Sequence, residues 1–176
     1  MTLSPDDVQL FYFLWFQLLD YANCKRQILP GKRHLELLDF MAIADVIWED
    51  VSIIDEFLED CAEELEPSHI EIVRGWKRRI RGSFVLERHL QKGSIFISMD
   101  NQQVYLVKGL VESWREMLRG APIPLAMDAT LIPFKDSLIT DGLVMPYAAA
   151  FGRNMVEELK DIYRTAKRNG SIHTTL

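Results

Sequence analysis

The segment Glu87-Arg88-His89 places a carboxylate, a guanidinium and an imidazole next to one another in a stretch that reads as a strand. Alternation along that strand would turn Glu87 and His89 to the same face. An imidazole beside carboxylates can act as a general acid or base, and Asp128 or Asp141 could join it. The chain contains no GxSxG or reactive-cysteine motif to supply a nucleophile. A hydrolase-like enzyme that uses Glu87, His89 and Asp128 or Asp141 is one hypothesis, although such a nucleophile motif is missing.

Arg88 falls on the opposite, apolar face of the predicted strand, together with Phe84 and Leu86. A guanidinium buried among apolar side chains needs a carboxylate partner. Asp128, in another predicted strand, and Asp141 are the candidates. The sequence thus predicts a largely buried ion pair at Arg88, which is also a candidate ligand-binding residue.

The run Gly152-Arg153-Asn154 opens the last predicted helix. Free backbone N–H groups at a helix start can hold an anion, so Arg153 and Asn154 are candidate ligand-binding residues. Neither a Walker A motif nor a GxGxxG motif is present. No cofactor is therefore expected.

A basic cluster, RGWKRRIR, covers residues 74–81. Its cationic side chains are those of Arg74, Lys77, Arg78, Arg79 and Arg81. Cations interleaved with an aromatic side chain, here Trp76, can follow a phosphate backbone. The net charge of -6 and the acidic segment just before the cluster favour a structural role instead, in which the cations stabilise the last turn of a helix. Nucleic-acid contact through this predicted helix is therefore the third hypothesis, and duplex DNA is expected to bind weakly or not at all.

Every charged residue between positions 49 and 66 is acidic. A calcium or magnesium site needs several oxygens that converge on one point, and these carboxylates are spread around a predicted helix. The pair Glu66 and His69 is separated by Pro67, which breaks a common helical face. The segment is therefore interpreted as a solvated surface, and no metal site is expected.

The two cysteines, Cys24 and Cys61, form neither a CxxC motif nor a Cys/His cluster. Two free thiols suit a reducing compartment, so a cytoplasmic location is expected. The apolar stretch LFYFLWFQLL follows acidic residues rather than a basic leader. It is also too short to cross a bilayer, so no membrane partner is expected.

That apolar stretch brings consecutive aromatic side chains, Phe11, Tyr12, Phe13, Trp15 and Phe16, into the first helix. Neighbouring residues of a helix point about 100° apart, so these rings cannot all face one core. Either the helix is enclosed on nearly all sides, or part of it contacts a protein partner or a second copy of the chain.

Periodicity predicts the elements that would position these residues. The predicted helices cover roughly residues 4–25, 33–48, 52–65, 69–80, 111–118 and 152–170. The predicted strands cover roughly residues 83–90, 94–99, 103–108, 125–134, 138–140 and 143–147. Lys135-Asp136-Ser137 has turn chemistry, and Asp141-Gly142 has the composition of a two-residue hairpin turn.

This order of elements predicts an α+β fold, with a helical N-terminal half, a small antiparallel and partly barrel-like sheet, and a closing C-terminal helix. The helical half would cover residues 1–81 and the sheet with its helix residues 82–176. The two halves could also form one single domain.

Three segments, LWFQLLDYAN, RGSFVLERHLQKGSIFIS and LIPFKDSLITDG, resemble a family of uncharacterised bacterial proteins. The last is also similar to the body of some proteins with a cysteine-rich SEC-C tail, which binds metal. This chain ends in IHTTL, without that tail, so no zinc role follows. The resemblance implies a bacterial, cytoplasmic protein and supplies no catalytic residue.

The leading functional interpretation is a non-catalytic binding or protein-interaction protein. It rests on an analogy, because small curled sheets commonly present a binding face. The hydrolase-like enzyme and the nucleic-acid-binding protein are the alternatives. Convergence of the charged candidates in a pocket would favour the enzyme, and a continuous basic surface would favour nucleic acid.

Overall fold

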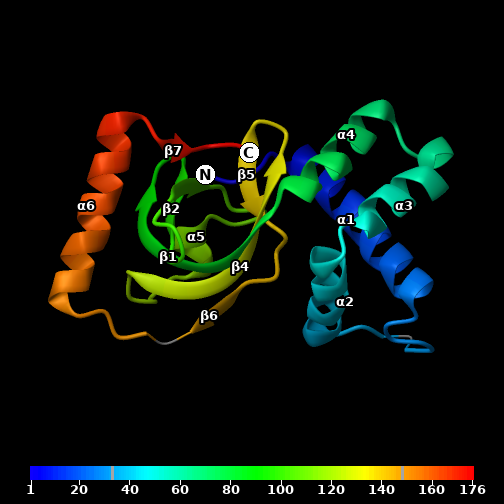
Figure 1. The fold of residues 1–176 in the computed structure, drawn as a ribbon, viewed down its shortest axis with the longest axis horizontal. Helices are drawn as coiled ribbons and strands as arrows, with labels where there is room; N and C mark the ends of the chain where they lie inside the picture. Colours follow the sequence, from blue (N-terminus) through cyan, green and yellow to red (C-terminus); the bar gives the residue numbers. More distant parts are fainter. Residues whose placement is uncertain (33, 148) are drawn as a thin grey trace. The chain divides into compact units, whose positions relative to one another are not determined.

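The computed structural model describes residues 1–32, 34–147 and 149–176 and divides the chain into two compact units. The helical unit comprises residues 6–77, and the sheet unit comprises residues 1–5 and 78–176. The described residues contain six α-helices and a seven-stranded mixed sheet (Figure 1). The predicted α+β class, with helices in the N-terminal half and a helix near the C-terminus, is confirmed.

The helical unit contains four α-helices and two short 3₁₀ segments. They are α1 (Pro5–Arg26), α2 (Leu37–Glu49), α3 (Ser52–Asp60), η1 (Ala62–Glu64), α4 (Pro67–Gly75) and η2 (Trp76–Arg78). Pro5 opens α1, as proline at the first helical position should. The predicted start of the second helix, Arg33, lies outside the described residues, and α2 begins at Leu37.

The core of the helical unit is built on stacked aromatic rings. Trp76 is fully buried and meets Phe11 and Trp15 edge-on, with ring centroids 6.0 Å and 5.8 Å apart. Trp15 in turn stacks on Trp48 at 5.2 Å. The indole N–H of Trp76 has no hydrogen-bond partner within the described chain. Apolar and aromatic packing therefore holds this residue in place without a polar contact.

The predicted ends of the third and fourth helices, at residues 65 and 80, are wrong. The helix α3 ends at Asp60, and α4 ends at Gly75 and passes through η2. The strand β1 already begins at Ile80, where it pairs with Leu131. The chain must be extended there to enter the ladder, so strand pairing overrides the local helical preference of the basic cluster.

The sheet unit contains seven strands and two α-helices. The strands are β1 (Ile80–Leu90), β2 (Gly93–Ser98), β3 (Val104–Val107), β4 (Leu125–Phe134), β5 (Ser137–Thr140), β6 (Met145–Tyr147) and β7 (Ile172–His173). The helices are α5 (Trp114–Met117) and α6 (Arg153–Asn169). The strands β1, β2 and β3 form the predicted antiparallel meander.

The sheet closes on itself through hydrogen bonds. Its order is β1-β2-β3-β5-β4-β6, and an additional β1–β4 pairing joins the ends of the first five strands. The β3–β5 and β3–β7 pairings are parallel, so the sheet is mixed and not wholly antiparallel as predicted. This ring of strands gives the sheet an inner and an outer face.

The two faces carry different hydrophobic clusters. Phe84, Phe96 and Tyr105 belong to the inner cluster, which Trp114 of α5 closes at a centroid distance of 5.0 Å from Phe96. The outer cluster consists of residues of β1, β2 and β3 packed against Leu159, Tyr163 and Ala166 of α6. Figure 1 shows α6 running alongside this part of the sheet.

A β-bulge at Glu87 changes the predicted alternation of β1. Leu86 pairs with Phe96 but Arg88 pairs with Ile95, so Glu87 is the extra residue. Beyond the bulge, Arg88 lies on the outer face, with its guanidinium carbon 4.0 Å from the ring centroid of Tyr163. The prediction that Arg88 shares a face with Phe84 and Leu86 is therefore wrong.

The two predicted turns of segment 131–147 have different outcomes. Lys135 and Asp136 do connect β4 and β5 tightly, with φ of 51° at Lys135. Asp141-Gly142 is no hairpin, because β5 and β6 both pair with β4. The opposite edge of β4 is occupied by β1, so β5 and β6 follow one another along the same edge. Asp141-Gly142 belongs to the irregular segment between them, where Gly142 has φ of 84°.

Candidate functional site

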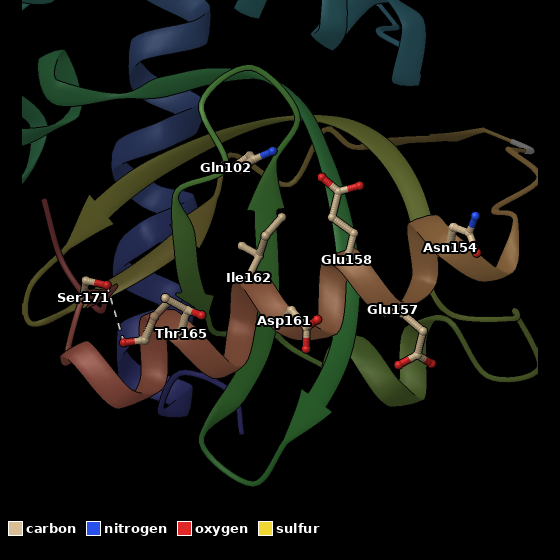
Figure 2. A pocket seen from close by; sticks show the side chains of 9 residues that line it. Gln102, Asn154, Glu157, Glu158, Asp161, Ile162, Thr165 and Ser171 are labelled. Carbon is tan, nitrogen blue, oxygen red and sulfur yellow. Dashed lines mark hydrogen bonds between the residues drawn. The ribbon is translucent and has the colours of Figure 1, made fainter.

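A wide, open groove runs along α6 in the sheet unit, and we call it the α6 groove. Its open part has a volume of about 770 Å³ and is lined by Gln102 of the β2–β3 loop and by a row of residues on α6. Figure 2 shows Glu158 and Ile162 pointing from α6 toward the loop that carries Gln102. The acidic side chains Glu157 and Asp161 lie along the same helix.

An apolar pocket of about 130 Å³ adjoins the open part of the α6 groove and shares Gln102, Glu158 and Ile162 with it. Its other lining residues are Val85, Ile97, Ser98, Met99, Phe151, Met155 and Leu159. Met99 and Met155 are each about half exposed, at 51% and 49%. The hydroxyl of Tyr147 lies 3.9 Å from the sulfur of Met99. Flexible apolar side chains therefore surround a small opening in the outer face.

The carboxylates of the α6 groove differ in their pairing. Lys160 contacts Glu157 at 2.8 Å, and Arg164 contacts Asp161 at 2.9 Å. Glu158 has no hydrogen bond or ion pair within residues 1–32, 34–147 and 149–176. Glu158 is also the carboxylate that borders the apolar pocket, so a negative charge stands unpaired at its rim.

A second pocket, of about 410 Å³, lies at one end of the sheet unit, and we call it the His89 pocket. Its polar lining side chains are those of His89, Gln91, Ser94, Ser113 and Arg115, and Trp114 also lines it. The Nδ1 atom of His89 lies 2.8 Å from the hydroxyl oxygen of Ser94. No acidic residue is among the residues that line this pocket.

Burial, and secondly the positive charge of Arg115, lower the pKa of His89 below its ordinary value. Between that lowered pKa and about 6.5, the unfolded chain binds more protons than the folded chain. The contribution of His89 to stability is therefore fully present above about pH 6.5 and declines as the pH falls through this window. Arg115 of α5 acts on the ring through its charge, and the Ser94 hydroxyl of β2 is hydrogen-bonded to it. Met1, Gln91 and Ser113 also line the pocket around the ring.

We therefore expect His89→Gln to lose less stability than the parent chain on acidification from about pH 7.5 to 5.5. Melting temperatures measured in chloride buffers across this range test the expectation. His173→Gln, at an exposed histidine of β7 that does not line the His89 pocket, is the matched control. A difference between parent and His89→Gln that stays constant over the range would contradict the prediction.

The predicted acid–base group does not assemble. Neither Glu87 nor the two aspartates line the pocket that contains His89. Asp128 accepts a hydrogen bond from Ser83 at 2.6 Å, about 20 Å of extended strand from His89. The backbone N–H of Asp141 donates to Thr130 at 3.2 Å, opposite a still earlier part of β1. Its carboxylate accepts from the N–H of Leu143 at 3.0 Å.

The predicted Arg88–aspartate pair is also wrong. Both carboxylate oxygens of the buried Glu87 contact the Arg88 guanidinium, Oε1 at 2.8 Å from Nη2 and Oε2 against Nε. The Arg88 side chain is 33% exposed and is covered in part by the ring of Tyr163. The bulge makes this neighbour-to-neighbour pair possible, because strict alternation would point adjacent side chains to opposite faces. The Glu87–Arg88 ion pair therefore lies on the outer face of the sheet, where it packs against Tyr163 of α6.

The basic cluster does not form the single helix that the nucleic-acid hypothesis requires. Arg74 lies in the last turn of α4, Lys77 and Arg78 lie in η2, and Arg81 lies in β1. Arg79 falls between η2 and β1. The cluster is divided between the two units, after Lys77. The prediction that residues 74–81 belong to one basic helix is therefore wrong.

The acidic segment is instead a partner for cations of its own unit, as its interpretation as a surface face implies. Lys77 contacts Asp55 at 2.5 Å. Arg26 contacts Glu56 at 2.6 Å, and Lys25 contacts Asp60 at 3.0 Å. Across the described chain, no group of three or more histidine, cysteine and acidic side chains is arranged to hold a metal ion.

The candidate ligand-binding residues Arg153 and Asn154 lie at the start of α6. Gly152 precedes α6, and Arg153 and Asn154 open it, as predicted. Asn154 lines the α6 groove beside Glu157 and Glu158, whose charges disfavour an anion at this helix start.

The aromatic residues of α1 divide between the core and the surface. Phe11 and Trp15 are buried, whereas Phe13 and Phe16 are about half exposed. The contact of α1 with a partner or a second copy stays a prediction. Within the described residues, no helix has the length and apolarity needed to traverse a lipid bilayer.

Sequence reasoning missed several residues of both pockets, namely Ser94, Met99, Trp114, Arg115, Met155 and Glu158. Alternation along residues 94–98 would have placed Ser94 on the inner face with Phe96. The spacing of Met155, Leu159 and Ile162 would have marked the apolar stripe of α6. No local pattern could have predicted that Arg115 and His89 line the same pocket, because they are distant in the sequence and only the tertiary structure places them together.

A comparison of the chain with protein-family models, curated proteins and solved structures finds no match.

Proposed function

We propose that the chain is a non-catalytic protein-interaction protein whose α6 groove binds a segment of another protein with an apolar side chain next to basic residues. The observation that carries this proposal is the apolar pocket bordered by the unpaired carboxylate of Glu158. The apolar side chain would enter the pocket, and the basic residues would lie along the acidic row of α6.

The apolar part of the proposal rests on the methionines at the pocket. Methionine side chains are unbranched and adapt to differently shaped partners, which is why they are frequent on peptide-binding surfaces. Met99 directly follows β2 and Met155 lies in the first turn of α6, so the two reach the pocket from different segments of the chain. A small apolar opening between them suits one leucine-sized or phenylalanine-sized anchor, the kind of residue that dominates the binding energy of an interface.

The electrostatic part of the proposal rests on the acidic row Glu157, Glu158 and Asp161. Lysine or arginine on the partner would pair with Glu158, which has no other partner within the described chain. The chain also carries a net charge of -6, so basic segments are attracted from a distance and acidic ones are repelled. The chemistry thus commits to a basic, apolar segment rather than an acidic one.

The hydrolase alternative needs a carboxylate beside His89, and none lines the His89 pocket. The His89–Ser94 hydrogen bond of 2.8 Å is compatible with a base and a hydroxyl nucleophile. A third group that orients the imidazole is part of that arrangement, and no carboxylate lines the His89 pocket. We therefore favour binding over catalysis.

We expect a fluorescein-labelled peptide with one phenylalanine flanked by lysines to bind the parent chain with a Kd of roughly 10 µM. The same peptide with glutamate in place of lysine should bind at least about tenfold more weakly, because it faces the acidic row. Fluorescence anisotropy at low and high salt measures both, and affinity for the basic peptide should fall as salt rises.

Two variants test the electrostatic and the apolar part of the α6 groove separately. Glu158→Lys should weaken the basic peptide by about tenfold or more through charge reversal, and Met155→Asp should do so by making the pocket polar. Glu112→Lys, at an exposed carboxylate outside the groove, is the matched control and should bind like the parent. Equal affinity for the basic and the acidic peptide, or equal loss in Glu112→Lys, would overturn the proposal.

A further inference from the structure

We propose that the His89 pocket is a binding site for a small organic anion, a carboxylate or a phosphate ester, which Arg115 and His89 contact directly. The inference is independent of the α6 groove, because the two pockets share no residue.

Arg115 is the charged group that carries the specificity for an anion. It lines the pocket and is exposed, and within the described part of the chain it has neither a hydrogen bond nor an ion pair. A guanidinium presents several N–H donors in one plane, a geometry that matches the oxygens of a carboxylate or a phosphate. Its nearest acidic neighbour in the chain, Glu116, is held by the backbone N–H and the hydroxyl of Ser113, at 3.0 Å and 2.6 Å.

His89 and Ser94 provide a second, pre-positioned donor. The hydrogen bond between Nδ1 and the Ser94 hydroxyl holds the imidazole ring in one orientation. When that hydroxyl donates to Nδ1, the proton of the neutral ring resides on Nε2, which then donates to a ligand. Ser94 is itself buried on β2, so the ring is supported by a rigid strand and not by a loop.

Trp114 supplies a wall for the organic part of the ligand. Its indole N–H donates to the carbonyl of Lys108 at 3.2 Å, and its ring packs against Phe96. These contacts fix the ring at the junction of the inner cluster and the pocket. The volume of about 410 Å³ is that of a typical metabolite site, which combines an apolar wall with a few convergent polar groups.

The lining excludes the opposite class of ligand. A cation or a metal ion would need carboxylate or carbonyl oxygens, and the charged side chain present is a guanidinium. An uncharged ligand would make no ion pair with that guanidinium, whereas an anion would make a charge-assisted hydrogen bond. The arrangement of groups therefore selects for negative oxygen atoms.

Titration of the isotope-labelled chain with inorganic phosphate, and separately with succinate, tests the site by nuclear magnetic resonance. Sodium chloride keeps the ionic strength constant, so that general screening does not mimic binding. We expect saturable shifts of the backbone signals of Gly93, Ser94 and Arg115 with a millimolar Kd for at least one probe. The probe that binds more tightly identifies the phosphate or the carboxylate class.

Arg115→Gln should weaken the better probe by about tenfold or more, because it removes the charge and keeps a polar side chain. Arg119→Gln, at an exposed arginine outside the pocket lining, is the matched control and should bind like the parent. Peptide binding at the α6 groove should be unchanged in Arg115→Gln, so that failure of this site and failure of the groove are distinguishable. Absence of saturation with both probes, or an equal loss in Arg119→Gln, would overturn the inference.

Discussion

Trp76→Ala is expected to destabilise the helical unit by about 3–5 kcal/mol, the cost typical of removing a large side chain from a packed core. Trp76 is fully buried and its ring contacts both Phe11 and Trp15. Alanine would leave a cavity between rings that are held by α1 and cannot collapse freely. Hydrogen exchange resolved by residue measures the effect, since protection of the α1 amides reports on the helical unit alone.

Trp76→Phe is the matched variant for this prediction. The indole N–H has no hydrogen-bond partner within the described residues, so losing it breaks no polar contact. Phenylalanine keeps an aromatic ring beside Phe11, and its cost should be roughly half that of alanine or less. If Trp76→Phe and Trp76→Ala reduced the protection of the α1 amides equally, the packing of an aromatic ring would not explain how Trp76 stabilises the helical unit.

Gly109→Ala should destabilise the sheet unit by about 3 kcal/mol or more, because the added methyl group has no room. An ideal Cβ at Gly109 would lie 2.0 Å from the carbonyl oxygen of Glu112. That neighbour is backbone and cannot rotate away, so the segment that leads to Trp114 and Arg115 must shift. We therefore also expect Gly109→Ala to weaken the binding of anions at the His89 pocket.

Gly152→Ala is the matched control, since it adds the same methyl group at a position where neighbouring atoms leave room for it. No atom lies within 4 Å of an ideal Cβ at Gly152, which precedes α6. Loss of glycine at this cap position should cost no more than about 1 kcal/mol. Thermal unfolding of the two variants measures the contrast, and a milder effect at Gly109 than at Gly152 would show that the loop before α5 is pliable.

Local signals predicted the parts of the fold that depend on neighbouring residues. The meander of β1, β2 and β3 followed from alternation. The last helix ends where it was predicted, in a left-handed cap at Gly170 with φ of 66°, a conformation that glycine adopts readily. Pro5 and the aspartates after it marked the start of α1. In each case the pattern that predicts the element lies within one short segment of the chain.

The candidate site was predicted less well. One extra residue in a strand, here at a bulge, reverses the face to which every following side chain points. The bulge at Glu87 turned Arg88 to the outer face and joined it to its own neighbour. His89 was singled out from its residue type, but its partners Ser94 and Arg115 are contributed by β2 and α5. Alternation counted from Phe84 could not foresee a bulge that depends on pairing with β2.

By itself, the sequence determined the class of the fold, the positions of most helices and strands, and the acidic character of the surface, since these depend on composition and on short-range periodicity. The tertiary structure decided which side chains meet. Pairing of both β5 and β6 with β4 turned Asp141-Gly142 from an expected hairpin into an irregular connection along one edge. Packing of α6 on the outer face created the groove at Glu158, and α5 brought Arg115 to His89. Contacts between residues distant in the chain depend on the registers of several strands at once, and no local pattern encodes them.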